Sequence, residues 1–111
     1  MLDVPSVFHP EHLGMTVPRT TGVAVTVLVA AYGRLPLLKQ AVASALAQDH
    51  PSFEVLIVDD GSGDETGAWL RARQDGEARL RVIFQPHQGV AAARANGVTA
   101  AKGELICILD S

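Results

Sequence analysis

The sequence is poor in cysteine, has no cluster of basic residues and has no long hydrophobic run. A single cysteine among 111 residues excludes a disulfide framework. Nine basic side chains against twelve acidic ones, without a lysine- or arginine-rich block, argue against nucleic-acid binding and against a polybasic membrane patch. The longest apolar run, residues 23–31, is less than half of the roughly 20 residues that a membrane-spanning helix needs. These shortages predict a soluble, cytoplasmic protein that is at most peripheral to a membrane.

The residues that are present alternate between strand-like and helix-like segments after residue 21. Residues 1–21 contain three prolines and show no sustained periodicity, so they are predicted to be an irregular tail. Apolar runs rich in β-branched residues predict four strands, at residues 23–31, 53–58, 80–84 and 105–109. Apolar spacing and alanine content predict three helices, over residues 35–46, 62–78 and 90–102.

Two local signals predict where helices begin and end. Ser62, with Glu65 three residues later, has the form of a capping box and predicts the start of the second helix. Gly103 is placed to end the third helix.

The order βαβαβαβ predicts an α/β, Rossmann-like fold with a mostly parallel sheet and right-handed crossovers. In such a sheet all strands end at the same edge, and ligands bind just outside it. The loops after the first, second and fourth strands are therefore the expected place for a site.

Acidic residues are predicted to meet at that edge, because Asp59 and Asp60 follow the second strand and Asp110 follows the fourth. Carboxylates at close range need a cation, and their oxygens suit Mg²⁺ or Mn²⁺, which would attract a diphosphate. Alternatively, Asp59, Asp60 and Gly61 only form a turn before a helix. The sequence contains neither the G-x-G-x-x-G dinucleotide fingerprint nor a P-loop.

Five segments, in order, resemble a known family. They are VTVLVAAYGR at 25–34, LAQDHP at 46–51, FEVLIVDDGS at 53–62 followed by Asp64 and Thr66, GVAAAR at 89–94 followed by Gly97, and AKGELICILDS at 101–111. With these segments, about four fifths of the chain resembles the amino-terminal half of a family 2 glycosyltransferase of the GT-A fold. Residues 22–111 are accordingly expected to be the nucleotide-sugar-binding half of such a domain.

The resemblance implies a role for five residues in binding a nucleotide-sugar donor. Ala30 and Tyr32 match the loop that lies against the base, where Tyr32 could stack. Asp60 resembles the carboxylate that binds the uracil N–H, and Arg94 matches an arginine near the donor. Asp110 matches the first acid of a D-x-D motif, whose carboxylates hold Mn²⁺ or Mg²⁺ against the diphosphate.

The implied activity is transfer of a sugar, with inversion, from a UDP-linked donor to an unknown sugar or lipid-linked acceptor, as in the assembly of cell-envelope polysaccharide. The sequence departs from the family pattern where Ala30 replaces a proline, Gly33 an asparagine and Ala95 an asparagine. The D-x-D motif is cut after Ser111, and no residue matches the family's general base. The domain is therefore expected to be incomplete, the chain inactive by itself, and the edge of its last strand open to self-association.

Three other functions compete with this one. A non-catalytic nucleotide-binding fragment fits the same residues. A receiver-type phosphoacceptor domain would need its acidic pair after the first strand, and a nucleotidyltransferase would need a glycine-rich basic loop there.

Several other residues have plain structural interpretations. The histidines are expected in solvated loops, with the lesser alternative that His87, which follows the third strand, approaches a donor. Cys107 and Trp69 are expected in packing, and Arg71, Arg73, Arg79 and Arg81 on a solvated face.

Overall fold

The computed structural model describes residues 24–47 and 52–110, and the predicted tail at residues 1–21 lies outside them. Within these described residues, four parallel strands form one sheet in the order β3-β2-β1-β4. The strands are β1 (Val25–Ala31), β2 (Phe53–Asp59), β3 (Leu80–Phe84) and β4 (Leu105–Asp110). The predicted α/β class and its βαβαβαβ order are confirmed.

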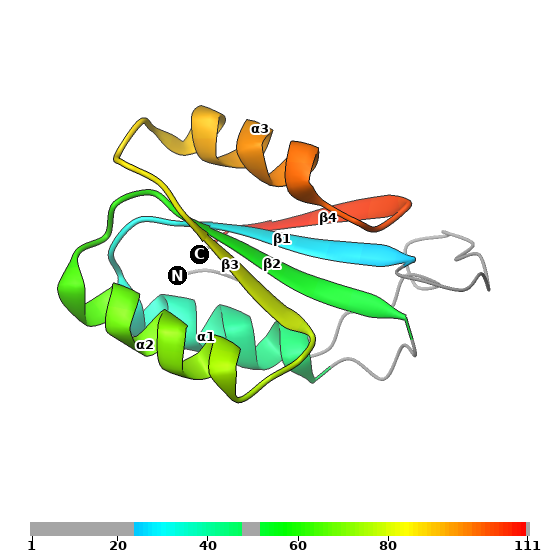
Figure 1. Cartoon of the computed structure of the whole chain (residues 1–111), viewed down its shortest axis with the longest axis horizontal. Coiled ribbons are helices and arrows are strands. Elements are labelled where there is room, and N and C mark those ends of the chain that lie inside the picture. Colours follow the sequence, from blue (N-terminus) through cyan, green and yellow to red (C-terminus); the bar gives the residue numbers. More distant parts are fainter. Residues whose placement is uncertain (1–23, 48–51, 111) are drawn as a thin grey trace.

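In the part of the chain that the structure describes, three helices cover the two faces of the sheet. They are α1 (Leu35–Leu46), α2 (Asp64–Asp75) and α3 (Val90–Ala100). Helices α1 and α2 lie against one face and α3 against the other (Figure 1). Strand order reverses at β1, which pairs with both β2 and β4. The loops that lead from β1, β2 and β3 into the helices therefore gather at one edge, on the left of Figure 1.

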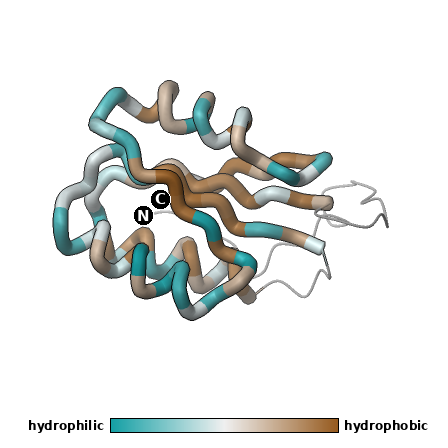
Figure 2. Tube along the Cα trace, in the orientation of Figure 1, coloured by the Kyte–Doolittle hydropathy of each residue, from teal (hydrophilic) through white to brown (hydrophobic). Residues whose placement is uncertain are grey.

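The core lies on both faces of β1 and β2, whose apolar residues form the brown centre of Figure 2. The larger cluster, which includes Val27, Val29 and Ile57, packs against α1 and α2. The smaller one packs Leu28 against Ala93 of α3. Gly97 lets α3 approach closely, because a Cβ at that position would overlap the side chain of Leu28.

The two predicted helix signals are wrong, for a tertiary reason in each case. Helix α2 begins at Asp64 after Gly63, without a side-chain cap, and the Ser62 hydroxyl instead accepts a hydrogen bond from the Gly33 N–H at 2.8 Å. Helix α3 ends at Ala100, before Gly103. The Gly103 N–H donates to the Thr26 hydroxyl at 2.9 Å, and a Cβ on Gly103 would stand 2.5 Å from the Thr26 nitrogen.

A buried carboxylate, Glu54, lies at the end of the sheet opposite those loops. It accepts hydrogen bonds from Arg81 Nε at 2.8 Å, from the Thr26 hydroxyl at 2.7 Å and from the Lys102 N–H at 2.7 Å. Burial raises the pKa of Glu54, but these hydrogen bonds and the charge of Arg81 outweigh it and hold the pKa below its ordinary value. Arg81 also donates to the Ala100 carbonyl at 2.7 Å, so the prediction that it lies on a solvated face is wrong.

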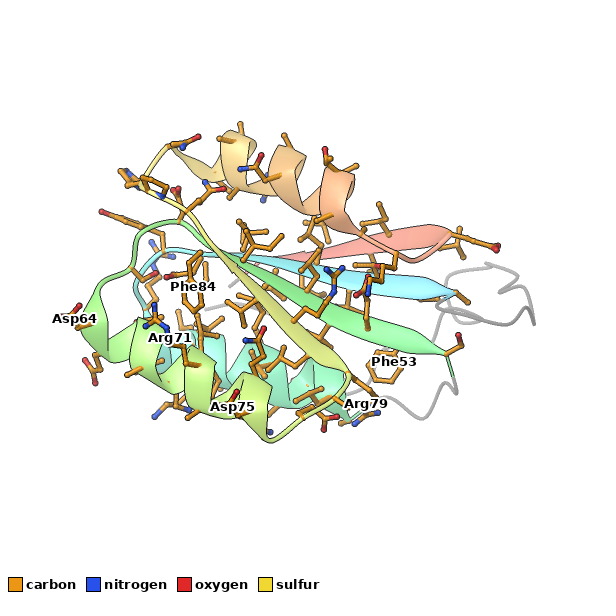
Figure 3. The ribbon with its side chains drawn as sticks, in the orientation of Figure 1. Phe53, Asp64, Arg71, Asp75, Arg79 and Phe84 are labelled. Atoms are coloured by element: carbon orange, nitrogen blue, oxygen red, sulfur yellow. The ribbon has the colours of Figure 1, made fainter. Side chains whose placement is uncertain are left out.

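Two other arginines cover aromatic rings, as Figure 3 shows. Arg71 lies over Phe84 at 4.4 Å and Arg79 over Phe53 at 4.8 Å, measured to the ring centroids. Trp69 packs against the larger core cluster, as predicted.

Strand β4 is an edge of the described sheet and leaves Ile106 and Ile108 exposed. Self-association through this edge stays a prediction. Cys107 is half-buried in β4, and burial raises the pKa of its thiol, as suits a packing residue. None of the described helices has the length and apolar character that would let it cross a membrane.

Candidate functional site

A hollow of about 140 Å³ opens at the carboxyl edge of the sheet. It lies where β1 and β2 end and where α3 begins. Three residues expected at the site from the sequence, Ala30, Tyr32 and Asp60, line it together. The remaining lining residues are Ala31, His87, Val90 and Ala93.

The Asp60 carboxylate organises the loop between β3 and α3. Its Oδ1 accepts hydrogen bonds from Gln85 Nε2 and from the Gln88 N–H, both at 2.8 Å. Its Oδ2 accepts the Gly89 N–H at 3.0 Å and lies 2.9 Å from His87 Nδ1. Asp60 is 2% exposed, so these groups replace the water that an ionised carboxylate would otherwise bind.

These contacts lower the pKa of Asp60. The hydrogen bond from the Gln88 N–H is the largest cause, burial opposes it, and Gln85, Gly89 and His87 add to the lowering. Asp60 is therefore a carboxylate at neutral pH and acts as an acceptor only.

Gln85 connects Asp60 to helix α3. The Gln85 side chain is buried and donates to Asp60, while its carbonyl oxygen accepts a hydrogen bond from the Asn96 amide. Neither residue was expected at the site from the sequence.

His87, for which the sequence favours a solvated loop, also belongs to the site. Its ring stacks on Tyr32 with centroids 4.2 Å apart and planes inclined by 23°. Nδ1 faces two acceptors of Asp60, Oδ2 at 2.9 Å and the main-chain oxygen at 3.2 Å, so this nitrogen carries the hydrogen. The only signal in the sequence was its position just after the third strand, which is equally common for a solvated residue.

Gly61 allows the loop between β3 and α3 to pack closely against the turn that follows β2. Its φ is +79°, and a Cβ there would stand 2.9 Å from the His87 nitrogen. The turn interpretation of Asp59, Asp60 and Gly61 is thus correct for Gly61, while Asp60 has contacts that a plain turn does not require.

One expected site residue, Arg94, is not among the described residues that line the hollow. Arg94 lies half-buried on α3. Asp110 ends β4 in register with Ala30 of β1, which places its main chain at the same edge, but its side chain lies outside the described part of the structure. Among the side chains that are described, no group of three or more His, Cys, Asp or Glu could hold a metal ion.

Comparisons with known proteins agree on the kind of protein. Residues 26–111 match the family model Glycosyl transferase family 2. The chain is 41% identical over 87 residues to the succinoglycan biosynthesis protein ExoO of Rhizobium meliloti, covering 78% of this chain and 25% of that protein. It is 35% identical over 88 residues to the putative glycosyltransferase EpsH of Bacillus subtilis, covering 79% and 26%.

A solved structure is similar in fold as well as in sequence. The mannosyltransferase PcManGT from Pyrobaculum calidifontis, in complex with GDP-Man and Mn²⁺, matches with a TM-score of 0.71 and 26% identity. The match covers 99% of this chain and 30% of that one. The chain thus spans about a quarter of the length of ExoO and of EpsH.

Proposed function

The chain belongs to glycosyl transferase family 2, and from that premise we propose that it binds the nucleotide of a UDP-linked sugar donor in an enzyme that transfers the sugar to an acceptor. The observation that carries the proposal is the hollow beside the ionised Asp60, with the Tyr32 ring at its rim. A flat ring can stack on an aromatic face while a carboxylate accepts its N–H, and a nucleobase offers both features.

The hydrogen bonds of Asp60 support uracil as the base. Each of its carboxylate oxygens already accepts a main-chain N–H, from Gln88 on Oδ1 and from Gly89 on Oδ2. Guanine presents two adjacent N–H donors and would need room on both oxygens, whereas uracil presents one. The similar mannosyltransferase is bound to GDP-Man, so GDP is the nucleotide with which UDP is to be compared.

A divalent cation, Mn²⁺ or Mg²⁺, is the proposed cofactor, with Asp110 as a ligand. A carboxylate is a suitable ligand for such ions, and the register of β4 with β1 brings the main chain of Asp110 to the edge that carries Tyr32 and Asp60. When bound, the ion would neutralise charge on the diphosphate of the donor. The base itself would be held by Tyr32, by Asp60 and by the loop around Asp60.

Arg94 on α3 is proposed to lie near the donor.

Titration calorimetry of the full-length protein with UDP, and separately with GDP, in the presence and absence of Mn²⁺ tests the proposal. We expect UDP to bind more tightly than GDP, and more tightly with Mn²⁺ than without it. Asp110→Asn should remove the effect of Mn²⁺ and keep metal-independent binding. Absence of binding to either nucleotide would contradict the proposal.

The remaining features of the proposed reaction concern the whole enzyme. We propose a sugar or lipid-linked acceptor, inversion at the transferred carbon and a cytoplasmic location. Because the chain spans only a quarter of the length of ExoO, these 111 residues alone are expected to give no transfer. A turnover assay with a UDP-sugar separates the enzyme from a fragment that only binds nucleotide.

A further inference from the structure

We infer that His87 occupies the position of the donor base when no donor is bound, and that the base must displace it to bind. The inference rests on the proposed function. His87 makes the two contacts expected of a base: its ring stacks on Tyr32, and its Nδ1–H points at Asp60 Oδ2.

The acceptor capacity of Asp60 requires an exchange. An ionised carboxylate has about four acceptor positions on its two oxygens. Among the described residues, four donors surround Asp60, two on each oxygen: Gln85 and the Gln88 N–H on Oδ1, and the Gly89 N–H and His87 on Oδ2. An N–H from a base can reach Asp60 only if one of these donors leaves.

His87 is the donor that can leave most easily. Two of the others are main-chain groups, and releasing them would unfold the turn that leads into α3. Gln85 is buried and held on its other side by Asn96. The His87 side chain is 56% exposed, so it can rotate into water and exchange its contact with Asp60 for contacts with solvent.

The stacking distance excludes the alternative in which the base enters between the two rings. The ring centroids of Tyr32 and His87 are 4.2 Å apart. A third ring between them would need roughly twice that separation. Unless His87 moves, its ring covers this face of Tyr32 and the base cannot stack there.

Competition of this kind lowers the apparent affinity for the donor. The apparent dissociation constant equals the intrinsic one divided by the fraction of molecules in which His87 has left the position. His87 is thus a specificity-determining residue, because only a ring that carries an N–H donor replaces both of its contacts.

Calorimetry with UDP on the full-length protein and on two variants tests the inference. His87→Ala removes both contacts and should tighten UDP binding, on the order of threefold to tenfold. His87→Phe keeps a ring for Tyr32 but loses the donor to Asp60, and should fall between His87→Ala and the wild type. Val98→Ala, on the exposed side of α3, is the control and should not change the affinity.

NMR of the wild-type protein gives a second measurement that needs no variant. The ring protons of His87 should be shifted by the neighbouring Tyr32 ring, and this shift should disappear as UDP is added. Weaker or unchanged UDP binding by His87→Ala, while the wild type binds, would overturn the inference and leave the proposed function standing. If neither UDP nor GDP binds to the wild type or the variants, the proposed function itself fails.

Discussion

The main-chain nitrogen of His87 lies 2.9 Å from the point at which a Cβ on Gly61 would stand. Gly61→Ala therefore adds a contact that is too short to a backbone conformation that alanine disfavours. We expect the variant to lose about 1–3 kcal/mol of unfolding free energy and to weaken UDP binding, because the loop around Asp60 must shift. Urea unfolding and calorimetry measure the two effects.

Gly63→Ala is the matched control for this variant. Gly63 also has a positive φ, +97°, but a Cβ there would meet nothing within 4 Å. It should show the cost of the backbone conformation alone and bind UDP as the wild type does. Equal effects of the two substitutions on UDP binding would show that the contact with His87 is unimportant.

Asp60→Asn should release the loop that Asp60 holds. In the Asp60→Asn variant an NH₂ group would replace one of the two carboxylate oxygens, so two donors would face each other where a donor now meets an acceptor. The charge of the carboxylate would also be lost. UDP affinity should fall by at least an order of magnitude, and the amide hydrogens of Gln88 and Gly89 should exchange faster. Asp64→Asn, on the exposed first turn of α2, is the control; an equal loss there would point to charge in general rather than to these hydrogen bonds.

Glu54 stabilises the chain in its ionised form, so the chain should be less stable in acid. Its folded pKa lies below the ordinary value of 4.5, so its contribution is complete above that value and is lost as the pH falls through the folded pKa. Glu54→Gln should cost about 1–3 kcal/mol at pH 7, and the difference from the wild type should shrink toward pH 3. Urea midpoints measured from pH 7 to pH 3 test this, and a difference independent of pH would contradict it.

Gly97→Ala should separate α3 from the sheet. The added methyl group would overlap the side chain of Leu28, which is completely buried. Overpacking of this kind costs about 1–3 kcal/mol. Gly76→Ala, whose added Cβ would have only ordinary contacts at 3.8 Å or more, should leave the melting temperature unchanged or raise it slightly. A neutral Gly97→Ala would mean that α3 can move outward at little cost.

The elements of the fold were predictable because each carries its own local pattern. Residues 53–58 and 80–84 are strands as predicted, and α1 has the predicted bounds, since apolar runs and helical spacing act over neighbouring residues. The helix signals failed where a distant partner competes. Ser62 could have capped α2, but its hydroxyl is used by the Gly33 N–H.

The candidate site was predictable only in part. Ala30, Tyr32 and Asp60 meet because parallel strands end at one edge, and the order of elements already implied that edge. Gln85 and Asn96 were missed, and His87 was expected in a solvated loop, because nothing local distinguishes a residue of this hydrogen-bond network from a solvated residue.

The sequence by itself determined the α/β class, the family and which strand ends carry the acidic residues, because these depend on the order and spacing of residues along the chain. Only the tertiary structure decided what Asp60 contacts. Its four donors come from a loop that lies more than twenty residues further along the chain, and which of them reach the carboxylate depends on how β2, β3 and α3 pack. That packing turns an acidic turn residue into an ionised acceptor and brings His87 onto Tyr32.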